Sequence, residues 1–110
     1  MKIFRSLAMA LATFTVASVA LGQSFGTPSP DVGAGQKRGA VCFACHGANG
    51  IAKVPGTPHL AGQDRAYLEK ALQAYRAGQV RQDPTMTAMA KPLSDADIVN
   101  LAAFFSLLPR

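Results

Sequence analysis

The sequence predicts a single all-α domain in which three short helices are joined by two long loops. Apolar residues recur at helical spacing in three segments, and no useful length of chain alternates apolar and polar residues as a strand would. The two stretches between these segments contain Pro and show little periodicity. Because long loops in a compact domain usually serve a function, we expect a cofactor between them to order them.

Composition excludes several classes of protein. Hydrophobic residues make up 49% of the 110 residues, which argues against a disordered chain. Two cysteines are too few for a disulfide-rich scaffold. A zinc site with four protein ligands would have to recruit the distant His59 besides Cys42, Cys45 and His46. The core of a domain of this size is usually too small to stabilise the fold alone, so we expect additional stabilisation from a disulfide, a metal or another bound group.

The first 22 residues are typical of a signal peptide. Lys2 and Arg5 form a positive start, and the apolar run over 7–21 is shorter than the roughly 20 residues that span a bilayer. Small residues at the end of the run predict cleavage after Ala20 or Gly22, with an uncleaved membrane anchor as the alternative. We therefore expect export to the periplasm.

The chain then divides into a signal peptide (1–22), a flexible polar leader (23–30) and one domain (31–110). Removal of the signal peptide leaves 11 − 2 = 9 basic residues against 6 acidic ones, a net charge of +3. This charge is too small for a strongly basic nucleic-acid binder, so no nucleic-acid partner is expected.

The first two helices have recognisable ends. Asp31 predicts the N-cap of a helix that runs to about Cys42, and Asp64 predicts the N-cap of a second helix that ends near Gly78. One face of the second helix carries its apolar and aromatic side chains, namely Tyr67, Leu68, Ala71, Leu72 and Tyr75.

The third helix follows the second loop. Ser94 with acidic residues behind it predicts an N-terminus, and helical spacing continues to Pro109. The predicted loops cover 47–62 and 80–93.

Two glycines in the first helix predict a close helix crossing. Gly35 and Gly39 each disfavour helix by ~1 kcal/mol relative to Ala, so their presence is explained if another helix passes close by. Phe104 and Phe105 on the last helix are the expected partners, and the alternative is that both glycines are incidental.

The chemistry is concentrated in Cys42-Phe43-Ala44-Cys45-His46. C-x-x-C-H is the attachment signature of c-type haem. Thiols one helical turn apart can each bond a vinyl group of one porphyrin, and the adjacent His46 then lies under the ring as an iron ligand. A thioredoxin-like redox pair would need a β-α-β context that the sequence lacks, and a simple disulfide is the other alternative.

Several short stretches carry a resemblance to a known family. They are Ala34-Gly35-Gln36, Cys42 to Gly47, Leu60-Ala61-Gly62-Gln63, Tyr67-Leu68, and Met86 followed by Leu93-Ser94-Asp95. Over 31–108 the chain resembles class I c-type cytochromes, in particular the small bacterial mono-haem branch and single halves of tandem di-haem cytochromes. The resemblance implies a cytochrome c-like fold whose first and last helices cross. It also implies one covalent haem c with His46 and Met86 as axial iron ligands.

The resemblance assigns further roles around the haem. Pro55 is expected to offer its carbonyl to the N–H of His46, with Pro58 as the competing candidate. Such a bond fixes the tautomer and orientation of the ring. Leu60 and Leu68 are expected to pack against the haem.

The choice of Met86 leaves Met89 as a second candidate for the sixth ligand. The family pattern places this methionine eight positions before the helix-capping Ser94, which selects Met86. Pro84 is expected to hold the approach to Met86 in extended form. His59 is expected to be a surface side chain.

Other side chains have open roles. Tyr67 and Tyr75 are expected in the wall of the pocket, with a hydroxyl bond to a haem propionate as a possibility. Arg65 and Arg76 either neutralise propionates or lie on a solvated helix face. Positive charge near the haem edge is expected from Lys37, Lys53 and Lys91.

With both axial positions filled, one-electron transfer is favoured over ligand binding or catalysis. We therefore expect a monomeric electron carrier, not an enzyme and without a small-molecule substrate. Its redox partners would be a membrane donor complex and a terminal oxidase, reductase or dehydrogenase. The alternatives are a dedicated haem subunit of a periplasmic dehydrogenase, and a sensor or enzyme whose methionine ligand dissociates.

Overall fold

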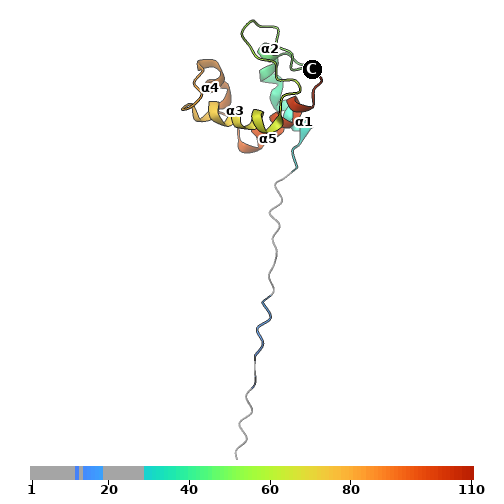
Figure 1. Ribbon diagram of the computed structural model, residues 1–110, viewed down its shortest axis with the longest axis vertical. Coiled ribbons are helices and arrows are strands. Elements are labelled where there is room, and N and C mark those ends of the chain that lie inside the picture. Colours follow the sequence, from blue (N-terminus) through green and yellow to red (C-terminus); the bar gives the residue numbers. More distant parts are fainter. Residues whose placement is uncertain (1–11, 13, 19–28) are drawn as a thin grey trace, which may run out of the picture.

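The computed structural model describes residues 12, 14–18 and 29–110 (Figure 1). The predicted signal peptide (1–22) and leader (23–30) therefore lie largely outside the described residues. Among the described residues, no helix has the length and apolar character needed to cross a membrane.

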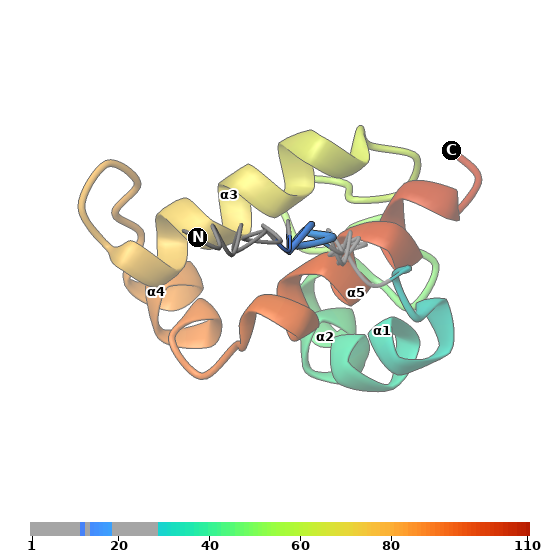
Figure 2. The same cartoon turned by 90° about the horizontal axis from the view of Figure 1, so that it is seen from below.

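The described part of the chain is helical and contains no strand, which confirms the all-α prediction. The helices are α1 (Val32–Arg38), the 3-10 helix η1 (Gly39–Cys42), α2 (Phe43–His46), α3 (Arg65–Ala77), α4 (Pro84–Ala90) and α5 (Asp95–Leu107). Figure 2 shows α5 between α3 on one side and α1 and α2 on the other, with α4 beside the end of α3.

The first predicted helix is formed by three consecutive elements. Asp31 caps α1, because its side chain accepts a hydrogen bond from the Ala34 N–H at 2.9 Å. The chain continues through η1 into α2 and stops at Gly47, whose φ of 83° lies outside the range of helical residues. This succession carries the C-x-x-C-H residues on a tightly wound segment.

The crossing of α1 and α5 is as close as the glycines predicted. A Cβ on Gly35 would lie 2.1 Å from the backbone oxygen of Asn100 and 3.1 Å from the Cβ of Phe104. A Cβ on Gly39 would lie 3.6 Å from the ring of Phe105. Only a residue without a side chain permits the approach at Gly35, so this glycine is required by packing.

The core is built on α5. This helix buries side chains around its whole circumference, as expected for a helix between two layers. The buried side chains of α5 are Ile98, Leu101, Ala102, Ala103, Phe104 and Phe105. Leu68 of α3 packs against the same cluster. Phe43 adds a third ring, with its centroid 6.1 Å from Phe104 and 6.3 Å from Phe105.

The prediction that 80–93 is a loop was wrong over its centre, where α4 forms. Asp83 caps α4 by accepting a hydrogen bond from the Met86 N–H at 2.8 Å. Pro84 is the first residue of α4, so it does not hold the approach to Met86 in the expected extended form. Proline is tolerated at this position because the first N–H groups of a helix have no partner within the helix. A helix of 7 residues is too short to reveal its period in the sequence.

The prediction of a loop over 47–62 is confirmed. Gly50 has a φ of 73°, and its carbonyl accepts hydrogen bonds from the N–H groups of Leu60 (2.8 Å) and Ala61 (3.0 Å). The Gly62 N–H donates to the Phe105 carbonyl at 3.0 Å, which ties the end of this loop to α5. The loop is thereby folded back over α2.

Candidate haem-binding site

A cavity of about 530 Å³ lies between α2, α3, α4 and the 47–62 loop. This size falls within the roughly 300–1,000 Å³ of cofactor and ligand pockets. Its lining is mainly apolar and includes both cysteines, His46 and both methionines of α4. A separate hollow of about 420 Å³, which shares Pro58 and Gln63 with this cavity, is lined by none of these groups, so the first cavity is the candidate site.

The two cysteines reach the cavity from η1 and α2, and no disulfide joins them. Burial raises the pKa of the Cys42 thiol, and the charge of Arg38 opposes this shift. Redox-active cysteine pairs have a lowered pKa instead. Cys42 thus lacks the lowered pKa of a redox-active cysteine, and both thiols face the cavity, as a covalent attachment requires.

His46 presents a free ring nitrogen to the cavity. Its side chain is buried, and Nδ1 lies 2.8 Å from the carbonyl oxygen of Pro58. A carbonyl oxygen can only accept, so Nδ1 carries the proton in this bond. In the neutral imidazole Nε2 is then unprotonated, which is the form that binds a metal.

The expected role of Pro55 as the acceptor was wrong, because Pro58 is the residue that accepts this hydrogen bond. Pro55 and Gly56 form the tip of a turn that is closed by a hydrogen bond from the Thr57 N–H to the Val54 carbonyl (3.1 Å). Gly56 has a φ of 78°, as the third residue of a type II turn requires. Pro55 is exposed and does not line the cavity, whereas Pro58 lies where the chain returns toward α2.

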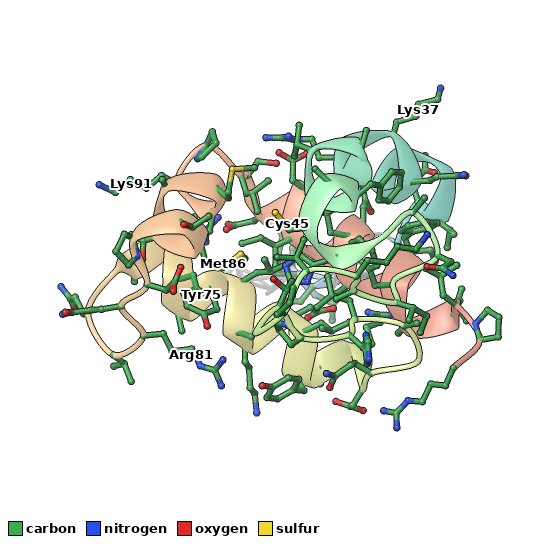
Figure 3. All side chains as sticks on the ribbon, turned by 90° about the horizontal axis from the view of Figure 1, so that it is seen from above. Lys37, Cys45, Tyr75, Arg81, Met86 and Lys91 are labelled. Carbon is green, nitrogen blue, oxygen red and sulfur yellow. The ribbon has the colours of Figure 1, made fainter. Side chains whose placement is uncertain are left out.

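The two methionines both line the cavity. Met86 and Met89 lie one turn apart on the same face of α4, Met86 half-buried and Met89 38% exposed. Figure 3 shows Met86 pointing from α4 toward the side on which Cys45 lies. Leu60 and Leu68 also line the cavity, and Leu68 is part of the core.

Arg81 is a cavity residue that the sequence did not reveal. Its guanidinium carbon lies 5.6 Å and 5.5 Å from the ring centroids of Tyr67 and Tyr75, and its Nη2 donates to the Tyr67 hydroxyl at 3.3 Å. Hydrogen bonding to Tyr67 raises the pKa of Arg81. Figure 3 shows Arg81 and Tyr75 together beside the cavity. Arg81 precedes α4 in a segment without periodicity, so no sequence signal selected it.

Arg65 and Arg76 stabilise the scaffold and do not line the cavity. Arg65 pairs with Glu69 at 3.0 Å, one turn along α3. Arg76 donates to the Leu93 carbonyl at 3.0 Å and to Asp95 at 2.7 Å, and so ties α3 to the start of α5.

The lysines expected to bring positive charge to the haem edge lie outside the cavity lining. None of the three lysines lines the cavity, and Figure 3 shows Lys37 and Lys91 projecting away from it at different ends of the domain. Among the described residues, Arg81 is the one arginine or lysine in the cavity lining. His59 is exposed, as expected, and its Nδ1 accepts a hydrogen bond from the Ala52 N–H.

Comparison with known proteins identifies the family. The model of the cytochrome c family matches residues 32–108. The chain belongs to the cytochrome c family. It therefore carries a covalently bound c-type haem, and the two thiols, the free imidazole nitrogen and the apolar cavity fit such a group.

Individual relatives agree with this assignment. The chain is 44% identical to cytochrome c-554(548) of Halomonas halodenitrificans, over 69% of this chain and 94% of the relative. It is 38% identical to a thiosulfate dehydrogenase electron acceptor of Thiomonas intermedia, over 84% of this chain and 43% of the relative.

A solved structure shows the same fold. Reduced cytochrome c4 from Pseudomonas stutzeri matches with a TM-score of 0.70 and 43% identity, over 74% of this chain and 47% of that chain. This chain thus spans nearly the whole of one relative and about half of the cytochrome c4 chain.

Proposed function

We propose that this cytochrome c is a periplasmic one-electron carrier whose haem iron is bound axially by His46 and Met86. The observation that carries this proposal is the bond between His46 Nδ1 and the Pro58 carbonyl, which leaves Nε2 as a lone-pair donor in the cavity. When bound, the haem supplies a one-electron couple at its iron, with a potential raised by methionine ligation.

Several residues of the chain would hold the haem, each by a different kind of contact. Cys42 and Cys45 hold it by thioether bonds, and His46 binds the iron on the α2 side. Met86 would bind the iron from α4, whose side chains line the same cavity. Leu60 and the core residue Leu68 exclude water from the haem faces.

We assign Arg81 to the carboxylates of the haem. A haem has two acidic side chains, and Arg81 is the cation that the described structure places in the cavity lining. Stacking near Tyr67 and Tyr75 restrains its guanidinium before any carboxylate is present.

The rim of the cavity is suited to brief contacts with redox partners. Exposed apolar side chains on this rim are Val41, Val54, Tyr67 and Met89. Transient redox encounters use small interfaces, below about 1,200 Å² in total. The likeness to a thiosulfate dehydrogenase electron acceptor supports a dehydrogenase as the electron donor. Purification from periplasm without a catalytic subunit would favour the free carrier over the dedicated subunit.

The test is the coordination state of the reduced protein. We expect reversible one-electron titration and no binding of carbon monoxide by the ferrous protein at neutral pH, because both axial positions are filled. Rapid carbon monoxide binding would instead support a sensor or enzyme whose methionine dissociates.

Export has its own test. Intact-mass measurement of periplasmic material should show a chain that begins near Leu21 or Gln23 and carries one haem. Retention of Met1 would contradict cleavage of the predicted signal peptide.

A further inference from the structure

His59 lies on the 47–62 loop, directly after the residue that holds His46. The Ala52 N–H donates to its Nδ1 at 2.8 Å. A backbone N–H can only donate, so Nδ1 must be unprotonated for this bond to exist. The two histidines therefore have opposite tautomers, His46 with its proton on Nδ1 and neutral His59 with its proton on Nε2.

The side chain of His59 joins the outgoing and returning halves of the loop. Backbone bonds to the Gly50 carbonyl hold residues 60 and 61, and the Gln63 side chain donates to the His59 carbonyl at 2.9 Å. Pro58 has no N–H to contribute to these bonds. Two bonds therefore tie the neighbours of Pro58 back to the outgoing chain, the one from the Thr57 N–H to the Val54 carbonyl (3.1 Å) and the one from the Ala52 N–H to His59. Of these two, the bond to His59 is the one made by an ionisable side chain.

The surroundings allow His59 to exchange protons with solvent. It is exposed and lines the hollow of about 420 Å³, which is separate from the candidate haem site and shares Pro58 with it. Besides His59, the ionisable residue among the described residues that line this hollow is Arg110. The remaining lining residues carry no ionisable group; they are Ile51, Pro58, Ala61 and Gln63. Exposed Lys53 follows Ala52. Histidine side chains ordinarily change charge between pH 5 and 8.

We propose that His59 is a pH-sensitive positioning residue for the axial ligand His46. Neutral His59 accepts the Ala52 N–H and keeps the Pro58 carbonyl in place for His46 Nδ1. Protonated His59 has no acceptor atom, so the restraint on the loop is lost and the bond between Pro58 and His46 loosens. This inference rests on the proposed role of His46 as an iron ligand.

The expected consequence is a pH-dependent reduction potential. An acceptor at Nδ1 makes an imidazole a stronger donor to its metal. A stronger donor favours ferric iron, so loosening this bond raises the potential. We therefore expect the potential of the wild type to rise as the pH falls from 8 to 5.

The experiment measures hydrogen exchange at the Ala52 amide and at His46 Nδ1 by NMR of the reduced holoprotein at pH 5 and pH 8. Wild type, His59→Asn and His59→Ala are compared at the same pH. Asn places an acceptor oxygen at the position of Nδ1 and does not titrate, so it should preserve the restraint.

At pH 8 both sites should exchange at similar rates in the wild type and in His59→Asn. At pH 5 exchange in the wild type should be about fivefold faster than in His59→Asn, which corresponds to losing a hydrogen bond of about 1 kcal/mol. His59→Ala should exchange faster than His59→Asn at both pH values, and the rise in potential should be smaller in His59→Asn.

Equal exchange of the wild type and His59→Asn at pH 5 would overturn the proposal. Faster exchange at Ala52 without a change at His46 would also overturn it, because His59 would then brace the loop without positioning the ligand. If His59→Ala does not fold, the comparison with His59→Asn still decides. Failure of the proposed function is distinguishable, because a wild type without iron-bound His46 would lack the ligand signature in its spectrum at every pH.

Discussion

Gly35 sets the distance between α1 and α5 at the scale of a single residue. Gly35→Ala would place a Cβ 2.1 Å from the Asn100 oxygen, so the helices must separate. We expect a loss of about 1–3 kcal/mol in the free energy of unfolding, the usual effect of overpacking. Gly33→Ala is the matched control on the same helix, because its Cβ would meet only Asp31 Oδ1 at 3.4 Å. Denaturant unfolding of the holoprotein should show no loss for this control; equal losses would contradict the packing argument.

Arg81 makes a second prediction at this scale. Arg81→Gln removes a positive charge beside the haem, so the reduction potential should fall because ferric iron is disfavoured less. Arg65→Gln is the control, since Arg65 pairs with Glu69 and does not line the cavity. Potentiometric titration at low ionic strength compares the two variants. An unchanged potential in Arg81→Gln would contradict the claim that Arg81 lies beside the haem.

The sequence could predict the site residues that belong to a spaced motif. Cys42, Cys45 and His46 are adjacent in the chain, so their spacing alone carries their chemistry. The choice between Pro55 and Pro58 depends on a turn that residue types do not define, and Pro58 was found by geometry. Arg81 is positioned by contacts with Tyr67 and Tyr75 of α3. Contacts between residues far apart in the chain leave no local sequence pattern, so Arg81 could not be predicted.

The N-terminus of α5 makes a prediction at the scale of the element. Ser94 and Asp97 form a reciprocal capping box, with the Asp97 N–H donating to Ser94 Oγ and the Ser94 N–H donating to Asp97 Oδ2, both at 3.0 Å. Ser94→Ala should lower the free energy of unfolding by about 1 kcal/mol. Thermal unfolding at neutral pH measures this loss, and an unchanged stability would contradict the capping role.

The same capping box predicts a pH dependence. The hydrogen bond from the Ser94 N–H lowers the pKa of Asp97 below its ordinary value of 3.8, and Arg38 adds to this shift. A carboxyl whose pKa is lower in the folded state stabilises the fold above its unfolded pKa, and this stability is lost as the pH falls through the folded pKa. The advantage of the wild type over Asp97→Asn should therefore be present at pH 7 and shrink below about pH 4. Unfolding measured across this range checks the sign, and an advantage that grows on acidification would contradict it.

Helices with an N-cap residue and a clear apolar period could be predicted from the sequence, whereas α4, which has a cap but is too short to show a period, could not. Asp31, Asp64 and Ser94 each precede an apolar helical period, and each caps a helix. Asp83 is followed by Pro84 in the same way, but α4 spans only Pro84–Ala90 and packs against α3. Its formation depends on that packing, because isolated helices this short are not stable.

At the scale of the whole molecule, we expect the fold to depend on the bound group. The cavity of about 530 Å³ lies against Leu68, Leu101 and Phe105, which belong to the core. A double variant with Cys42→Ala and Cys45→Ala should be colourless and largely unfolded, because the small core has lost its additional stabilisation. Circular dichroism of this variant checks the prediction. Native helix content without haem would show that the core is sufficient alone.

The all-α architecture could be predicted from periodicity, and the crossing of the first and last helices from the family resemblance, with which Gly35 and Gly39 agree. The path of the 47–62 loop could not, because it depends on long-range hydrogen bonds such as the one from Gly62 to Phe105. This path places Pro58 beside His46 and closes one side of the cavity.

The central claim is axial ligation by His46 and Met86, and the absorption spectrum of two methionine variants tests it most directly. Met86 and Met89 lie on one face of α4, and both line the cavity. Met86→Ala should abolish the weak red-end sulfur-to-iron band of the oxidised protein and lower its potential, whereas Met89→Ala should retain the band. Loss of the band in Met89→Ala with its retention in Met86→Ala would contradict the account.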